Sequence, residues 1–192
     1  MIRIGVLGDI GSGKSFVAKQ FGYPVFNADN EVNELYGNNR KCFFKLKRKF
    51  PDYIKSFPIK KDNILKVVLA NKNNLKKITK IIHPEIYLRM RKFINKNKSK
   101  KIIILDIPLL LENKINKKND ILIFIDAPKK QIDKRIKKRK NYNFHVFENL
   151  KKIQLPLEIK KKKSDFVIKN TFRNKPVKKS VKNILEKILL YA

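Results

Sequence analysis

Apolar residues occur along this chain in two distinct patterns. Five short runs, rich in isoleucine and valine, are continuously apolar rather than alternating with polar residues. Such runs are typical of strands that are buried on both faces, as in a parallel sheet covered by helices on each side. The predicted strands are Ile2–Leu7, Pro24–Asn27, Lys101–Asp106, Ile121–Asp126 and Asp165–Lys169. We therefore predict a three-layer α/β fold with a five-stranded parallel sheet.

The stretch 37–100 shows the second pattern. It contains no convincing strand, and its apolar residues recur every three or four positions, as on one face of a helix. Examples are Ile64, Val67, Val68, Leu75, Ile78 and Ile82. We interpret this stretch as a helical insertion into the α/β core. Within it, His83-Pro84 is predicted to begin a helix, because proline is favoured at the first helical position and Glu85 would then lie in the first turn.

A glycine-rich segment follows the first predicted strand. Residues 8–15 fit the phosphate-binding loop pattern G-x-x-x-x-G-K-[ST], and they lie where that pattern must lie, between a strand and a helix. The glycines allow backbone N–H groups to surround a phosphate, and the next helix presents its positive end to the anion. We expect Lys14 to bridge the β- and γ-phosphates of ATP and Ser15 to bind Mg²⁺. The predicted nucleotide-binding residues are Gly8, Gly11, Ser12, Gly13, Lys14, Ser15 and Phe16.

Three aspartates lie at or just after the carboxyl ends of predicted strands, at the sheet edge that carries this loop. A hydroxyl acceptor must lose a proton during phosphoryl transfer, and Asp29 is a candidate base for that proton; the alternative is that Asp29 only caps the helix after it. Asp106 occupies the position from which P-loop proteins usually hold Mg²⁺, so we assign it to the metal or the acceptor. Asp126 is assigned mainly to capping the next helix.

A basic helix is predicted over 128–140, and a segment without clear apolar periodicity follows at 141–152. Arg135 and Arg139 are four residues apart and so share one face of this helix. In a chain that strongly prefers lysine, two arginines suggest that phosphate oxygens require a planar guanidinium. We predict a transition-state role for one of them, with a solvated helix face as the alternative. The position of 141–152 suggests a mobile lid.

Together these features predict a single P-loop kinase domain over residues 1–192, with ATP and Mg²⁺ as its cofactors. The segments of the predicted nucleotide-binding core are 1–36, 101–140 and 153–192. The helical insertion at 37–100 and the lid at 141–152 interrupt this core.

The formal net charge of +32 raises the alternative of a nucleotide-dependent nucleic-acid binding protein. The lysines, however, are spread through every segment, with few aromatic or arginine neighbours for stacking or bidentate contacts. Lysine, asparagine and isoleucine are all abundant, and all three have A/T-rich codons, so a genomic bias accounts for the composition. We expect small-molecule substrates and no specific nucleic acid partner.

Cysteine content and apolar runs bear on the compartment. Cys42 is the only cysteine, so no intramolecular disulfide can form. The chain begins with a strand and a glycine loop rather than a signal peptide, and no apolar run approaches the roughly 20 residues of a membrane span. We therefore expect a cytoplasmic protein without membrane attachment; the sequence leaves the oligomeric state open.

In their order along the chain, the motifs resemble those of the dephospho-CoA kinase family. The phosphate loop, Asn27-Ala28-Asp29 and the H-P-x-I motif at 83–86 are similar to family motifs in the first half. The D-x-P-L-L-x-E motif at 106–112 and D-A-P at 126–128 follow. The remaining positions that resemble the family are Tyr36, Gln131, Arg135, Arg139, Gln154, Pro156, Glu158, Lys160, Asp165 and Asn170.

The resemblance implies that ATP phosphorylates the ribose 3′-hydroxyl of dephospho-coenzyme A, with Mg²⁺, to give coenzyme A and ADP. It also implies that 37–100 binds the acceptor and that the lid closes over ATP. Another P-loop kinase, acting on a nucleoside monophosphate or a small metabolite, is the alternative; it should show clustered arginines where this insertion has mostly lysines. Three residues depart from the family pattern: Asp9 and Phe16 in the loop region, and Asn27, which leaves Asp29 as the sole candidate base in its motif.

Overall fold

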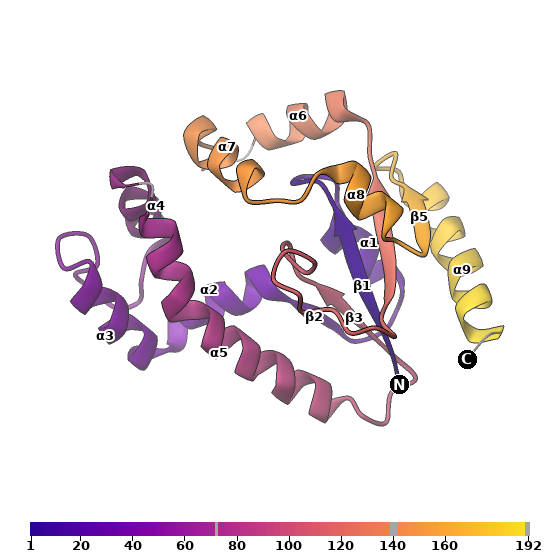
Figure 1. The fold of residues 1–192 in the computed structure, drawn as a ribbon, viewed down its shortest axis with the longest axis horizontal. Helices are drawn as coiled ribbons and strands as arrows, with labels where there is room; N and C mark the ends of the chain where they lie inside the picture. The colour runs from indigo at the N-terminus through magenta and orange to yellow at the C-terminus, as the bar shows by residue number, and fades with distance from the viewer. Residues whose placement is uncertain (72, 139–141, 191–192) are drawn as a thin grey trace. The chain divides into compact units, whose positions relative to one another are not determined.

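The computed structural model describes residues 1–71, 73–138 and 142–190 and contains a five-stranded, all-parallel sheet in the order β2-β3-β1-β4-β5 (Figure 1). This confirms the predicted α/β fold with its five strands. The strands are β1 (Ile2–Gly8), β2 (Val25–Asn27), β3 (Ile102–Asp106), β4 (Ile121–Asp126) and β5 (Phe166–Lys169).

The chain divides into two compact units, of which the first contains the sheet and comprises 1–27, 97–142 and 149–192. Alternate strand residues, such as Ile4 and Ile104, form an apolar core with α1 and α9. On the other face α8 contacts β1, and a Cβ at Gly5 would lie 2.5 Å from Leu110 Cδ2, so the close approach there requires glycine. The helices of this unit are α1 (Lys14–Gln20), α6 (Lys129–Lys137), α8 (Leu157–Lys162) and α9 (Asn174–Leu190).

The second unit, 28–96 with 143–148, has a separate core built from helices. Of the apolar residues that predicted these helices, Val67, Val68, Ile78 and Ile82 are buried in that core. Its helices are α2 (Ala28–Asn38), α3 (Arg40–Lys49), α4 (Lys61–Ala70) and α5 (Asn74–Lys96), and α7 (Phe144–Lys152) begins in this unit. The prediction of a helical stretch without strands between the second and third strands is confirmed for the residues that the structure describes.

The predicted helix start at His83-Pro84 is wrong, because Pro84 lies inside the 23-residue helix α5. An interior proline removes one backbone hydrogen bond and costs about 3 kcal/mol. Ile78 and Ile82 before the proline and Met90 after it are all buried. Burial of these side chains on both sides of Pro84 offsets the local cost, so the helix continues through the proline.

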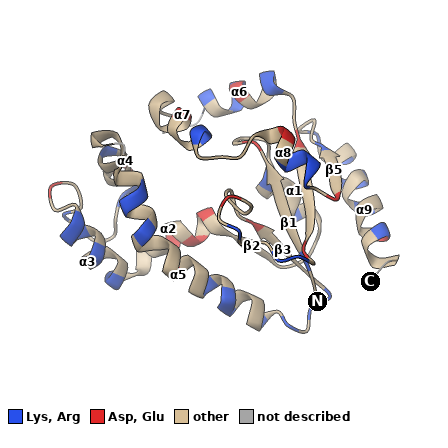
Figure 2. Cartoon of the chain, in the orientation of Figure 1, with Lys and Arg blue, Asp and Glu red and all other residues tan. Residues whose placement is uncertain are grey.

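Charged side chains are distributed over both units. Lysines and arginines occur on helices throughout the chain rather than on one element (Figure 2). Among the described residues, no helix is both long enough and apolar enough to cross a membrane.

Candidate active site

The phosphate-binding loop joins β1 to α1, as the sequence predicted. Gly13 is the N-cap of α1 with φ 87°, and Gly11 has φ 84°, backbone conformations that residues with a side chain rarely adopt. Two side chains also crowd these glycines: a Cβ at Gly11 would lie 2.8 Å from Ile136, and one at Gly13 would overlap Asn170. The loop therefore depends on glycine for both its backbone conformation and its packing.

Lys14 lies folded back against this loop. Its Nζ donates hydrogen bonds to the carbonyl oxygens of Asp9 at 2.8 Å and Gly8 at 3.2 Å. The Asp9 carboxylate accepts a hydrogen bond from the backbone N–H of Ile10 at 2.7 Å. The loop's own carbonyl oxygens thus hold the Lys14 ammonium at the start of α1, where the helix end also favours an anion.

Asn170, directly after β5, holds the phosphate loop from the end of a strand that β4 separates from β1. Its side chain is fully buried; Nδ2 donates to the Ser12 carbonyl oxygen at 2.8 Å, and Oδ1 accepts from the Phe172 N–H at 2.9 Å. Its own N–H donates to the Asp126 carbonyl oxygen at 2.7 Å. The sequence marked Asn170 only as a position that resembles the family; its signal was an asparagine directly after a predicted strand.

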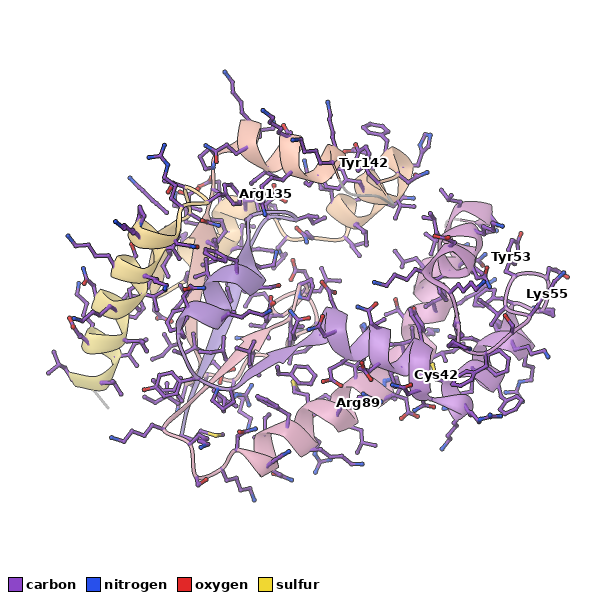
Figure 3. All side chains as sticks on the ribbon, turned by 180° about the vertical axis from the view of Figure 1, so that it is seen from behind. Cys42, Tyr53, Lys55, Arg89, Arg135 and Tyr142 are labelled. Atoms are coloured by element: carbon purple, nitrogen blue, oxygen red, sulfur yellow. The ribbon has the colours of Figure 1, made fainter. Side chains whose placement is uncertain are left out.

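Arg135 projects from α6 (Figure 3), and its guanidinium carbon lies 4.5 Å from the centre of the Phe172 ring. Phe172 has φ 60°, the left-handed region that few residues other than glycine adopt. This contact joins the basic helix to the loop that Asn170 anchors. Arg139, the second predicted arginine, lies outside the described residues.

Ser15, Asn27 and Asp106 meet where three elements of the first unit end or begin. The register of β2 and β3 pairs Asn27 with Asp106. Asn27 Nδ2 donates to the Asp106 carboxylate and, at 3.2 Å, to Ser15 Oγ. The structure therefore brings the two predicted metal-binding residues, Ser15 and Asp106, onto one asparagine.

Asp29 lies in the first turn of α2, which begins at Ala28. It is therefore not the N-cap residue of that helix, although a carboxylate in the first turn still interacts favourably with the helix dipole. Its side chain is exposed.

The capping role predicted for Asp126 is wrong. The N-cap of α6 is Pro128, which makes no side-chain capping bond. Asp126 Oδ2 instead accepts a hydrogen bond from Lys161 Nζ of α8 at 3.1 Å. This partner of Asp126 lies 35 residues further along the chain. A rule based on neighbouring residues could not predict the pairing.

A cavity of about 500 Å³ lies beside the phosphate loop within the first unit. Its walls combine apolar side chains with three lysines and two aspartates. The lining residues are Asp9, Phe124, Ile125, Asp126, Ala127, Lys129, Ile132, Lys151, Lys152, Gln154, Leu155, Pro156 and Leu157. This mixture of cationic groups and apolar surface suits an organic anion.

Glu112 and Lys160 form a buried ion pair that sequence reasoning did not identify. Lys160 Nζ lies 2.6 Å from Glu112 Oε1, and the two side chains are 1% and 9% exposed, respectively. The same Glu112 oxygen accepts from the N–H of Leu155, which lines the cavity, at 2.9 Å. Among the described residues, Glu112 Oε2 has no hydrogen-bond partner. The pair links the segment after β3 to the last turn of α8.

Desolvation shifts the pKa values of three groups in the second unit. His83 is exposed at the surface, and its partial desolvation lowers its pKa and so favours the neutral imidazole. Burial raises the pKa of Tyr36, and the nearby Cys42 adds to this effect. Burial also raises the pKa of the Cys42 thiol, and the nearby Glu85 adds to that shift.

Arg89 of α5 (Figure 3) forms an ion pair with Glu31 at 2.9 Å. Within the described part of the chain, no group of three or more histidine, cysteine or acidic side chains could hold a metal ion.

The chain is similar to known proteins along nearly its whole length. The sequence model of the dephospho-CoA kinase family matches residues 2–175. The dephospho-CoA kinase of Wolbachia sp. subsp. Brugia malayi is 33% identical over 192 residues, which cover 97% of this chain and 98% of that protein.

Two solved structures have similar folds. A protein from Thermus thermophilus gives a TM-score of 0.77 at 25% identity, with 97% of each chain covered. The dephospho-CoA kinase of Campylobacter jejuni gives a TM-score of 0.63 at 24% identity, with 97% of this chain and 96% of that chain covered. The family match and the full-length identity together show that this chain is a kinase that belongs to the dephospho-CoA kinase family.

Proposed function

We propose that the protein transfers the γ-phosphoryl group of ATP to the ribose 3′-hydroxyl of dephospho-coenzyme A, which gives coenzyme A and ADP. Membership of the family supports the acceptor. The single structural observation that carries the proposal is the phosphate loop, in which Lys14 is held by loop carbonyls at the start of α1. That arrangement suits a nucleoside triphosphate as the phosphoryl donor.

The transfer requires a group that accepts the proton of the 3′-hydroxyl, and we assign this role to Asp29. Its carboxylate is exposed and follows β2 after a single alanine. Lys14 would neutralise charge on the β- and γ-phosphates during transfer, and the backbone N–H groups of residues 8–16 would bind the phosphates. Arg135 or Arg139 would stabilise the charge that develops on the transferred group.

Ser15 and Asp106 are the proposed ligands of Mg²⁺. The Ser15 side chain is exposed, Asp106 supplies a carboxylate, and both are oxygen donors of the kind that Mg²⁺ prefers. Mg²⁺ at this place would neutralise charge on the β- and γ-phosphates. One carboxylate and one hydroxyl suit a cation that nucleotide phosphates and water also coordinate, rather than one held by the protein alone.

We assign acceptor binding to the helical insertion at 37–100 and closure over ATP to the lid at 141–152. Closure of a lid would exclude water from the γ-phosphate and limit wasteful hydrolysis. We also propose that the protein is cytoplasmic, as a soluble enzyme of coenzyme A synthesis would be.

The experiment that tests the reaction is an acceptor comparison. Purified protein is incubated with Mg·ATP and dephospho-coenzyme A, with AMP, with CMP, or without acceptor, and ADP and coenzyme A are quantified. We expect both products only with dephospho-coenzyme A. ADP formation with AMP or CMP instead would assign the chain to another acceptor, and absence of turnover with every acceptor would reject the proposed reaction.

A further inference from the structure

Asn27 joins the two residues that we propose as Mg²⁺ ligands. Its amide Nδ2 donates to Ser15 Oγ at 3.2 Å and to Asp106 Oδ2. An amide nitrogen carries two hydrogens, so one can serve each partner. Because an ionised carboxylate can only accept hydrogen bonds, the amide nitrogen must be the atom that faces Asp106.

The strand register determines that Asn27 meets Asp106. The parallel register places Asn27 of β2 beside Asp106 of β3, each the last residue of its strand. Asp106 is 3% exposed, so its carboxylate has little freedom to choose another orientation. Ser15 is the second residue of α1, the helix that follows the phosphate loop. One side chain thus fixes the hydroxyl and the carboxylate relative to each other.

The hydrogen bonds leave both partners able to bind a cation. A serine hydroxyl has two lone pairs, of which Asn27 uses one, and Asp106 keeps its second carboxylate oxygen. Asn27 itself is neutral, so Ser15, Asn27 and Asp106 together carry one negative charge, that of Asp106. Hydrogen bonds that orient metal ligands typically change metal affinity 10- to 100-fold when they are removed.

We infer that Asn27 is a positioning residue that holds Ser15 and Asp106 ready for Mg²⁺ and limits the negative charge beside the triphosphate, an inference that rests on the proposed metal site. Two consequences follow. Without the amide, Mg²⁺ should strengthen nucleotide binding less than in the wild type. With a carboxylate at this position, nucleotide binding should become unusually dependent on Mg²⁺.

Calorimetric titration with a non-hydrolysable ATP analogue, in EDTA and in excess Mg²⁺, separates these effects. The ratio of the two Kd values measures the coupling between Mg²⁺ and nucleotide. For Asn27→Leu we expect an unchanged Kd in EDTA and a coupling about tenfold below wild type. For Asn27→Asp we expect Kd in EDTA to rise about fivefold through repulsion of the triphosphate, and the coupling to exceed that of the wild type.

Asn63→Asp in α4 is the matched control, because it makes the same chemical change at another half-buried asparagine, in the second unit. Its coupling should equal that of the wild type. Wild-type coupling in both Asn27 variants, or equal changes in Asn27→Asp and Asn63→Asp, would overturn the inference.

Turnover of dephospho-coenzyme A by the wild type is measured on the same preparation. If the Asn27 variants show the expected changes in coupling but the wild type shows no turnover, the inference stands and the proposed reaction fails. If turnover occurs and both Asn27 variants couple like the wild type, the reaction stands and the inference fails.

Discussion

Replacement of Lys160 by methionine is expected to destabilise the protein strongly. Methionine keeps the length of the side chain and removes the ammonium that lies 2.6 Å from Glu112 Oε1. The Glu112 side chain is only 9% exposed, so water cannot replace the lost partner. Its other oxygen already has no hydrogen-bond partner among the described residues.

The expected magnitude follows from this burial. Removal of one partner of a buried ion pair typically costs about 3–5 kcal/mol, because a buried charge is left uncompensated. The double variant Lys160→Met/Glu112→Leu removes both charges and leaves the N–H of Leu155 without its acceptor, which costs about 1–3 kcal/mol. The double variant is therefore expected to be more stable than Lys160→Met alone.

Urea unfolding followed by far-UV circular dichroism measures these differences, since the chain has no tryptophan for fluorescence. Lys161→Met is the matched control. Lys161 pairs with Asp126 at 3.1 Å, but both side chains are well exposed, at 43% and 39%, and such pairs contribute at most about 1 kcal/mol. A loss below about 1 kcal/mol for Lys160→Met, or a double variant less stable than Lys160→Met alone, would refute the reasoning.

Three further substitutions test individual residues. Asp29→Asn is expected to abolish phosphoryl transfer while nucleotide binding in calorimetry persists; near wild-type turnover would rule out Asp29 as the base. Lys14→Ala is expected to lower kcat at least a hundredfold with an unchanged circular dichroism spectrum, and an active variant would contradict its role at the phosphates. Because partial desolvation lowers the pKa of the exposed His83, the folded state binds fewer protons there than the unfolded state, so a small loss of stability is expected as pH decreases through about 6.5. His83→Gln should flatten that part of the profile of unfolding free energy against pH, and an unchanged profile would exclude His83 as its source.

The sequence predicted the sheet because the signal is local. Continuous isoleucine-rich runs such as those of β3 and β4 are typical of strands in the centre of a covered sheet. The phosphate loop was equally visible, since its glycines and Lys14 are contiguous. Features that depend on neighbouring residues alone could therefore be predicted from the sequence.

The features that sequence reasoning missed depend on residues that are far apart in the chain. Asn27 and Asp106 are 79 positions apart, and they meet only because β2 and β3 are neighbours, an order that the apolar runs do not specify. The buried Glu112–Lys160 pair likewise requires the segment after β3 to pack beside α8. At Pro84 a local rule predicted the start of a helix. The burial of α5 side chains before and after Pro84 instead favours one continuous helix.

The most direct test of the proposed function is to identify the atom that receives the phosphoryl group. The wild-type protein is incubated with Mg·ATP and dephospho-coenzyme A, and the product is isolated and analysed by phosphorus and proton NMR. We expect one new phosphomonoester, attached to the ribose 3′-oxygen, in a one-to-one ratio with ADP. A phosphomonoester at another position, or ADP without a phosphorylated acceptor, would contradict the proposed reaction.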